Sequence, residues 1–185
     1  MRVNILLSSA LLAVAAAITG AQTPTPVGTT GKPSPTASGS FMDAEGRTVG
    51  QVRLQQTPRG VLLKIDLTNA TPGIHAIHMH EVGRCDAPSF ESAGAHLDTA
   101  AHKHGFMNPA GQHTGDLPNL EVPATSKLSV EYAMDGVTVE SGARSLLDAD
   151  GSALVIHAGK DDYASDPAGG SGDRLACARI SADRR

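Results

Sequence analysis

Residues 52–67 read VRLQQTPRGVLLKIDL, and the pattern of this stretch decides the fold class. Apolar and polar residues alternate from Val52 to Gln55 and again from Leu63 to Leu67, which is the period of a strand with one buried face. Between them, Thr57–Gly60 has the composition of a turn. We therefore expect two antiparallel strands joined as a hairpin.

Short apolar segments recur along the rest of the chain, and none has apolar residues at helical spacing. Further strands are expected at residues 74–82, 128–134, 137–140, 153–157 and 175–180. The 20 glycines and 11 prolines supply turns between them. Many short strands with such turns predict an all-β fold, an antiparallel sandwich or Greek-key barrel.

The composition excludes several classes of protein. The chain of 185 residues is 40% hydrophobic and 18% charged, which is typical of a globular domain and disfavours a disordered chain. It has three Phe, two Tyr and no Trp, so it lacks the aromatic side chains on which single-stranded nucleic acid stacks. The formal net charge of −4 also argues against binding to nucleic-acid phosphates.

The first 40 residues differ from the rest of the chain. Residues 1–21 have the pattern of a secretory signal peptide, in which Arg2 precedes a mostly apolar run over Ile5–Ile18. This run is too short and too weakly apolar for stable membrane insertion. Residues 22–40 are rich in Thr, Pro, Gly and Ser and predict a flexible tether, which leaves 41–185 as the folded domain. We expect an exported protein, periplasmic or extracellular.

The chain contains two cysteines, Cys85 and Cys177. An exported protein meets oxidising conditions, so we expect one disulfide between them. Two buried free thiols are the alternative.

The histidines carry the clearest functional signal, because all eight lie between residues 75 and 157. His78 and His80 are two positions apart on an expected strand, so both rings leave the same face, about 7 Å apart, and can converge on one ion. His157 ends another expected strand. If the two strands are neighbours, three imidazoles meet in a site that suits copper.

Residues 83–118 interrupt the strand pattern, and a loop of this length is usually functional. We expect metal or disulfide bonds to hold it. The loop carries the further candidate ligands His96, His102, His104, His113 and Asp116. Nitrogen donors with one carboxylate suit a tetrahedral zinc site. The alternative is a set of solvated loop histidines.

Six motifs occur in a distinctive order and spacing. They are GIHAIHMHE from residue 73, SAGAH from 92, KHG from 103, HTGDL from 113, VIH from 155 with Asp161 four residues beyond its histidine, and GDRLAC from 172. In these motifs the chain resembles the copper, zinc superoxide dismutases, and the likeness covers residues 41–180. The segment that starts at Cys85 resembles the bacterial exported branch. The resemblance implies an immunoglobulin-like Greek-key barrel or sandwich of eight antiparallel strands with long metal-binding loops.

The resemblance also implies which residues hold the metals. Copper would be bound by His78, His80, His96 and His157, and zinc by His96, His104, His113 and Asp116. His96 would thus bridge the two ions. Asp161 would link His78 to His104 as an outer carboxylate that fixes the orientation of both rings. Of the remaining histidines, we expect His102 to be solvated and His75 to be a hydrogen-bonded structural residue.

The family reaction converts two superoxide anions and two protons to dioxygen and hydrogen peroxide, with copper cycling between Cu(II) and Cu(I) and zinc in a structural role. By this resemblance Arg174 would attract and orient the anion, and His96 would deliver a proton. Between His157 and Arg174 the chain has one lysine, Lys160, fewer than family members with a longer loop there. We therefore expect Arg174 to be helped by Lys160 and by Arg84 or Lys103.

The two cysteines match the family disulfide. A non-catalytic exported copper and zinc buffer, or a copper-delivery protein, is the alternative function. The resemblance is compatible with a monomer or a homodimer.

Overall fold

The expected hairpin is formed by β2 (Thr48–Gln56) and β3 (Gly60–Leu67), which pair in antiparallel register. The Thr57 N–H donates to the Gly60 carbonyl oxygen across 2.8 Å and closes the turn. A Cβ at Gly60 would lie 2.1 Å from the Met134 carbonyl oxygen of the next strand. Glycine is therefore what allows the two strands to approach this closely.

The structure, a computed structural model, describes residues 34–183. In this range the other elements are β1 (Thr36–Asp43), β4 (Gly73–His75), β5 (Ile77–His80), the 3₁₀ helix η1 (Glu91–Ala93), β6 (Leu120–Val122), β7 (Leu128–Asp135), β8 (Ala153–His157), β9 (Arg174–Arg179) and β10 (Ser181–Ala182). No helix among these residues has the length and apolar character to cross a membrane. The predicted all-β class is confirmed.

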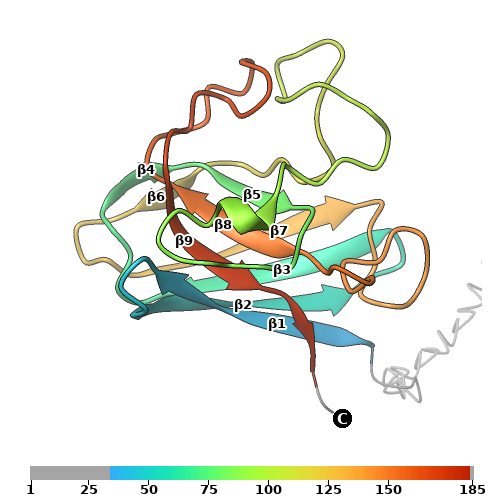
Figure 1. Ribbon diagram of the computed structural model, residues 1–185, viewed down its shortest axis with the longest axis horizontal. Coiled ribbons are helices and arrows are strands. Elements are labelled where there is room, and N and C mark those ends of the chain that lie inside the picture. Colours follow the sequence, from blue (N-terminus) through green and yellow to red (C-terminus); the bar gives the residue numbers. More distant parts are fainter. Residues whose placement is uncertain (1–33, 184–185) are drawn as a thin grey trace, which may run out of the picture. The chain divides into compact units, whose positions relative to one another are not determined.

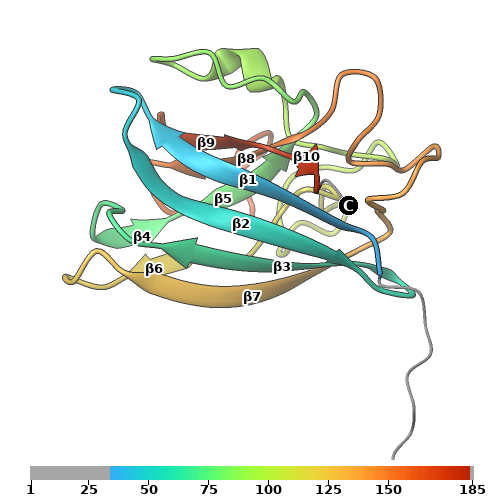
Figure 2. The same ribbon diagram turned by 90° about the horizontal axis from the view of Figure 1, so that it is seen from below.

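Eight of the strands form one antiparallel sheet. Its order is β5-β8-β9-β1-β2-β3-β7, and β10 pairs with β1. Figures 1 and 2 show that the sheet curls, so that its two ends face each other across the core. The short strands β4 and β6 pair separately. Strands that neighbour each other in the sheet but not in the sequence, such as β5 and β8, are what bring the histidines together.

The concave side of the sheet carries one apolar core. In β2, Val52 and Leu54 are fully buried while Arg53 between them is exposed, as the alternation predicts. The largest side chains of this core with less than 2% exposure are Phe41, Leu54, Leu63, Ile65, Ile77, Met79, Leu120, Leu146 and Leu154. Burying each such side chain contributes about 1.5–3 kcal/mol, so the sheet is a rigid support for the loops at its edge.

The expected strand over residues 74–82 is divided in two. β4 ends at His75, β5 begins at Ile77, and the two pair with different partners, β6 and β8. Ala76 lies between them, and its N–H donates to the Gly159 carbonyl oxygen while its own carbonyl accepts from the His157 N–H. The strand is interrupted because these backbone groups bond to His157, at the end of β8, and to Gly159 beyond it.

The strand expected at residues 137–140 is wrong. Only an isolated bridge between Thr138 and Ser145 forms there. The side chain of Gln56 takes the place of a neighbouring strand, since its Oε1 accepts from the Val139 N–H at 2.9 Å. The alternation was nevertheless meaningful, because Val137 and Val139 are both buried in the core.

The expected tether extends too far. β1 begins at Thr36, so residues 36–40 belong to the sheet although their composition is that of a linker. Ala37 in this stretch is fully buried, and Gly39 allows close approach, because a Cβ there would lie 2.6 Å from the Arg179 carbonyl oxygen. The predicted signal peptide and the tether up to residue 33 lie outside the described residues.

The predicted disulfide is present. Cys85 and Cys177 are bonded, with their Cα atoms 5.6 Å apart and 92 positions apart in the chain. Cys177 lies in β9 and packs in a second, smaller cluster that includes Phe90 and Val155. The bond therefore fixes the start of the long 83–118 loop to the sheet.

Removing this bond should lower stability. We expect Cys85→Ser to reduce the free energy of unfolding by about 2–4 kcal/mol and the melting temperature by about 4–16 °C, because a long loop is released in the unfolded chain. Cys177 remains in place and keeps the packing of its cluster. Thermal unfolding followed by circular dichroism is the measurement, and an unchanged melting temperature would contradict a stabilising disulfide.

Candidate metal centre

β5 lies at one end of the sheet order and presents histidines to its neighbours on both sides. It pairs with β8, in which His157 is the last residue. On its other side a bridge joins His80 to His96, and the Leu97 N–H donates to the Met79 carbonyl oxygen across 2.8 Å. Three segments far apart in the sequence thus place their imidazoles together.

The four histidines expected at the copper position form one buried cluster, with one ligand atom from each within 4.8 Å of all the others. Four buried ring nitrogens in it have no hydrogen-bond partner: Nδ1 of His78 and Nε2 of His80, His96 and His157. The expected grouping is therefore present.

The opposite ring nitrogen of each histidine in this cluster is held by the chain. Nδ1 of His80 donates to the Gly94 carbonyl oxygen at 3.0 Å, and Nε2 of His78 bonds to Asp161 Oδ2 at 2.9 Å. Nδ1 of His157 lies 3.2 Å from Ser171 Oγ. A ring whose proton is used in such a bond presents a lone pair at its other nitrogen. The cluster is thus a preformed set of nitrogen donors, which suits copper.

Burial keeps three imidazoles of this cluster neutral. It lowers the pKa of His80 to about 2 and that of His157 to about 3. Burial also lowers the pKa of His96 to about 4, against the opposing hydrogen bond to Asp116. At physiological pH all three rings are available as metal ligands rather than as cations.

A second group of histidines converges on Asp116. Its Oδ1 lies 3.1 Å from Nδ1 of His96, 3.0 Å from Nδ1 of His104 and 3.5 Å from Nδ1 of His113. Burial raises the pKa of Asp116, but the hydrogen bonds from His104 and His96 outweigh it and hold the pKa below its usual range. Three imidazole nitrogens and one ionised carboxylate are a donor set that fits tetrahedral zinc.

His113 is the loosest member of this second group. Its Nδ1 is buried, lies 3.5 Å from Asp116 Oδ1 and makes no hydrogen bond. The group of ligand atoms that lie within 4.8 Å of one another on this side contains His96, His104 and Asp116 as expected, but His78 in place of His113. The ring centroids of His78 and His96 are 3.9 Å apart. The two expected sets are thus contiguous, and His96 belongs to both.

Asp161 connects the two groups, as expected. Its fully buried carboxylate bonds to Nε2 of His78 through Oδ2, at 2.9 Å, and to Nε2 of His104 through Oδ1, at 3.0 Å. Burial lowers the pKa of His104, but its bonds to Asp116 and Asp161 outweigh burial and raise the pKa to about 9. The ring of His104 is therefore held at both nitrogens by carboxylates.

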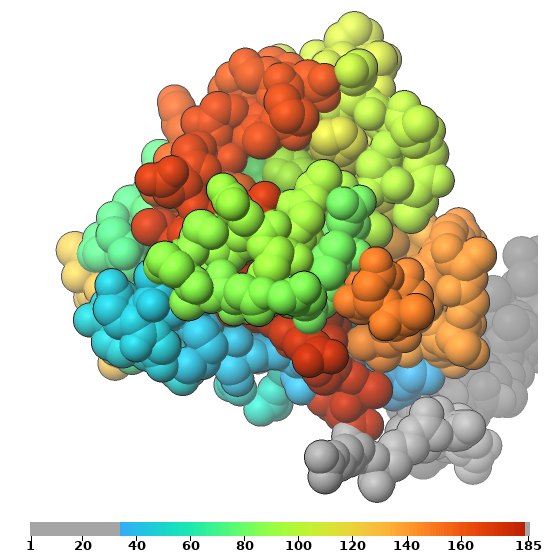
Figure 3. Space-filling view, viewed as in Figure 1, coloured from blue at the N-terminus to red at the C-terminus, as the bar shows by residue number. Residues whose placement is uncertain are grey.

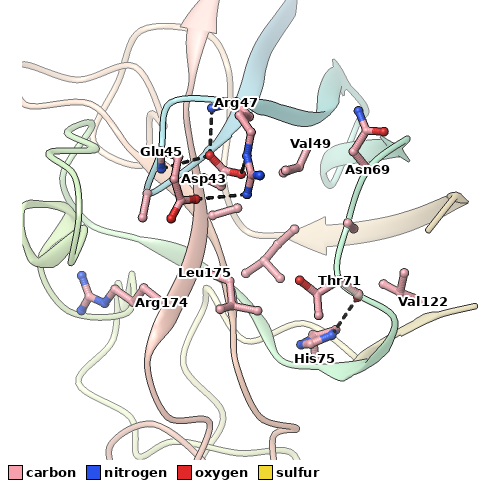
Figure 4. Close-up of a pocket in the computed structure, with 14 residues that line it drawn as sticks. Asp43, Glu45, Arg47, Val49, Asn69, Thr71, His75, Val122, Arg174 and Leu175 are labelled. Atoms are coloured by element: carbon pink, nitrogen blue, oxygen red, sulfur yellow. Dashed lines mark hydrogen bonds and ion pairs between the residues drawn. The ribbon is translucent and has the colours of Figure 1, made fainter. Parts of the chain in front are cut away.

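Arg174 is held beside His80 by backbone carbonyls. Its guanidinium donates to the Phe90 carbonyl oxygen at 2.6 Å and to the Gly94 carbonyl oxygen at 2.8 Å. Arg174 also lines the pocket drawn in Figure 4, where its guanidinium points toward the segment around η1. Because the Gly94 carbonyl also accepts from His80, the cation and the imidazole share one anchor.

The two remaining histidines lie outside both groups, as expected. His75 lines a pocket of about 220 Å³ (Figure 4), and its ring nitrogens lie 3.0 Å from the Thr71 carbonyl oxygen and 2.8 Å from the His157 carbonyl oxygen. It supports the backbone at His157. His102 is 45% exposed and pairs with Asp98.

Comparison with known proteins agrees with this geometry. The family profile described as copper/zinc superoxide dismutase matches residues 48–180. A superoxide dismutase [Cu-Zn] of Caulobacter vibrioides is 45% identical over 139 residues, which cover 74% of this chain and 80% of the relative. The chain belongs to the copper/zinc superoxide dismutase family.

Further relatives and solved structures are also similar to this chain. A superoxide dismutase [Cu-Zn] of Aquifex aeolicus is 43% identical, covering 74% of this chain and 82% of the relative. The structure of a superoxide dismutase-like protein from Bacillus subtilis superposes with a TM-score of 0.73 at 38% identity, covering 76% of this chain and 95% of that chain. The Cu/Zn superoxide dismutase from Brucella abortus has a TM-score of 0.61 at 28% identity, covering 79% and 99%.

Several residues that support the centre of this superoxide dismutase family member were not predicted from its sequence. Asn119 and Tyr163 bond to Asp161, and the Asp166 carboxylate accepts from the His104 backbone N–H at 3.0 Å. Gly169 packs directly against Asp161. The pair of consecutive glycines at 169 and 170 was a visible signal of unusual backbone, whereas the other contacts join segments too far apart in sequence to be anticipated.

Gly169 provides a sharp test of how closely Asp161 is packed. A Cβ at Gly169 would lie 1.9 Å from Asp161 Oδ1, whereas a Cβ at Gly170 would come no closer than 3.9 Å to any side chain. Both residues have nearly the same left-handed backbone, with φ of 63° and 65°. The two alanine variants are therefore matched for backbone strain.

We expect Gly170→Ala to cost about 1–2 kcal/mol of unfolding free energy for its backbone alone. Gly169→Ala should lower the unfolding free energy by at least about twice as much. It should also weaken Co(II) binding to the metal-free protein, because Asp161 is displaced from His104. Chemical denaturation and a cobalt titration check this. If the two variants had equal unfolding free energies and equal cobalt affinities, close packing around Asp161 would be contradicted.

The pH dependence of the metal-free protein follows from the same histidines. His104 has a pKa raised to about 9, so its stabilising contribution is complete below its unfolded pKa of 6.5 and is lost as the pH rises through 9. The pKa values of His80, His96 and His157 are lowered, so stability is lost as the pH falls below 6.5. We expect the melting temperature to be highest near neutral pH. A melting temperature that continues to rise on acidification would contradict neutral buried histidines.

Proposed function

We propose that the protein is a copper- and zinc-dependent superoxide dismutase that converts two superoxide anions and two protons to dioxygen and hydrogen peroxide. The observation that carries this proposal is the set of four buried, unpartnered imidazole nitrogens next to a fixed guanidinium. Burial keeps the rings of His80, His96 and His157 neutral, and Arg174 supplies a cation at the same place. Both features suit an oxidoreductase that acts on a small anion.

The proposed ligands follow from the two groups. Copper would be held by His78, His80, His96 and His157, and zinc by His96, His104, His113 and Asp116. When bound, copper supplies one-electron transfer in both directions, and zinc does no redox chemistry. His113 is the ligand expected to move most on zinc binding, since its Nδ1 lies furthest from Asp116 Oδ1.

His96 has the position of a proton donor. Its Nδ1 is held by Asp116, and its Nε2 lies in the other cluster without a partner. A proton carried at Nε2 would therefore face the place where a reduced oxygen species must be protonated. The histidine keeps its orientation during this change because Asp116 holds the opposite nitrogen.

Arg174 would bind and orient the anion. Two backbone carbonyls fix the guanidinium, so its side chain loses little conformational entropy when the anion binds. Of the auxiliary cations expected from the sequence, Lys103 is paired with Asp166 at 2.9 Å and Arg84 with Asp86. Attraction of the anion is therefore assigned to Arg174 and Lys160.

Export is part of this proposal. The first 21 residues have the pattern of a signal peptide, a disulfide is present, and the relatives compared above are bacterial. We place the mature domain in the periplasm or outside the cell. Mass spectrometry of protein recovered from the periplasmic fraction would detect loss of residues 1–21.

The function is tested by comparing mature protein loaded with copper and zinc with the zinc-only form. We expect rapid, copper-dependent dismutation, which His157→Ala abolishes while Co(II) still binds at the His104 side, because His157 lies in the copper group alone. His102→Ala is the matched control and should keep full activity, since this ring is exposed and lies outside both groups. An inactive protein with both metals bound would favour metal buffering or delivery instead.

A further inference from the structure

Asn119 makes an unusual pair of contacts with Asp161. Its side-chain Nδ2 donates to the Asp161 carbonyl oxygen at 3.0 Å, and its Oδ1 accepts from the Asp161 N–H at 2.8 Å. One amide side chain thus satisfies both backbone polar groups of Asp161. In a sheet, the backbone of a neighbouring strand would make these two hydrogen bonds.

Asp161 needs such support because no strand or helix contains it. Residues 158–173 form a loop without regular secondary structure, yet Asp161 is only 2% exposed and its carboxylate must reach His78 and His104 together. Figure 3 shows this loop, in red-orange, on the surface beside the yellow-green loop that carries His104. A shift of its backbone would change both hydrogen bonds to the histidines.

Asn119 is itself well fixed. The next residue, Leu120, begins β6 and pairs with His75 of β4. The Asn119 carbonyl accepts from the Tyr132 hydroxyl at 3.1 Å, and its N–H donates to the Tyr163 hydroxyl oxygen at 2.8 Å. The contact with Asp161 therefore originates from a rigid part of the structure.

Tyr163 closes the arrangement. Its backbone N–H donates to Asp161 Oδ1 at 2.6 Å, while its hydroxyl oxygen accepts from Asn119. Its carbonyl oxygen also accepts from the Met107 N–H at 2.8 Å, in the loop that carries His104. Asn119, Asp161 and Tyr163 thus form a ring of hydrogen bonds with links to both loops.

We propose that Asn119 and Tyr163 form a brace that positions Asp161, and through it the rings of His78 and His104. Asn119 follows Asp116 by three positions, so it ties together the backbones of the two carboxylates that hold His104 at Nδ1 and at Nε2. The brace sets the orientation of that ring. Both residues are positioning residues, and the inference rests on the proposed metal-binding role of the two histidines.

The test replaces Asn119 by leucine, which has a similar volume and no hydrogen-bonding side chain. Co(II) in the zinc position serves as a spectroscopic probe for His104, and the electron paramagnetic resonance spectrum of Cu(II) serves for His78. We expect Asn119→Leu to shift both spectra and to release cobalt to a chelator at least about tenfold faster. Tyr163→Phe, which removes only the hydroxyl, should change both readouts in the same direction by a smaller factor.

Tyr132→Phe is the matched control. It removes a hydroxyl that bonds to the Asn119 backbone and leaves the amide contacts with Asp161 intact. It should lower the melting temperature without altering either spectrum. Comparing this control with Asn119→Leu separates a loss of Asp161 positioning from a general loss of stability.

Wild-type spectra and cobalt release in Asn119→Leu would overturn the brace, even if that variant melts earlier. If Asn119→Leu does not fold, Tyr163→Phe decides by the same two readouts, and its identity with wild type would overturn the proposal. A wild-type protein that binds neither cobalt nor copper would instead overturn the metal centre, and the brace with it.

Discussion

The carboxylate of Asp161, shared between His78 and His104, is the interaction on which the arrangement of the site depends. One of its oxygens holds a histidine from a strand of the sheet and the other holds a histidine from a long loop. An isolated buried carboxylate is strongly unfavourable, so it is tolerated only while both imidazoles and the Tyr163 N–H bond to it. The sheet and the loops are therefore fixed to each other, because each buried polar group of the site must keep its hydrogen-bond partner.

The sheet and the loops contribute to the site in different ways. Pairing of β5 with β8 brings His78, His80 and His157 together through backbone register alone. The loop residues have no such register, and their positions come from side-chain hydrogen bonds and from the bond between Cys85 and Cys177. This explains why the long segment after β5 can be ordered although it contains only one short 3₁₀ helix.

The features that depend on neighbours in sequence were predictable. Alternation at residues 52–67 predicted the hairpin, and the two-residue spacing of His78 and His80 predicted rings on one side of a strand. The strand predicted at 137–140 was wrong, because a glutamine side chain replaced the expected partner strand.

The supporting residues could not be predicted in this way. Asn119 and Asp161 are 42 positions apart and meet only because β6 and the last long loop lie side by side in the fold. Nothing in the local composition of either segment indicates that contact. The candidate metal ligands could be identified from their residue types and spacing, whereas the residues that orient them could be identified only from the three-dimensional structure.

The carbonyl of Gly94 has a consequence for how such a site can change over evolutionary time. This single oxygen anchors both the imidazole of His80 and the guanidinium of Arg174. Gly94 has φ of 77°, and a Cβ there would lie 2.9 Å from the Glu81 side chain, so the backbone at this point tolerates little variation. A substitution nearby that displaces this carbonyl displaces the side chains of His80 and Arg174 together. The two side chains therefore behave as one geometric unit, and a change in a surrounding loop that leaves this carbonyl in place leaves their relative position unchanged.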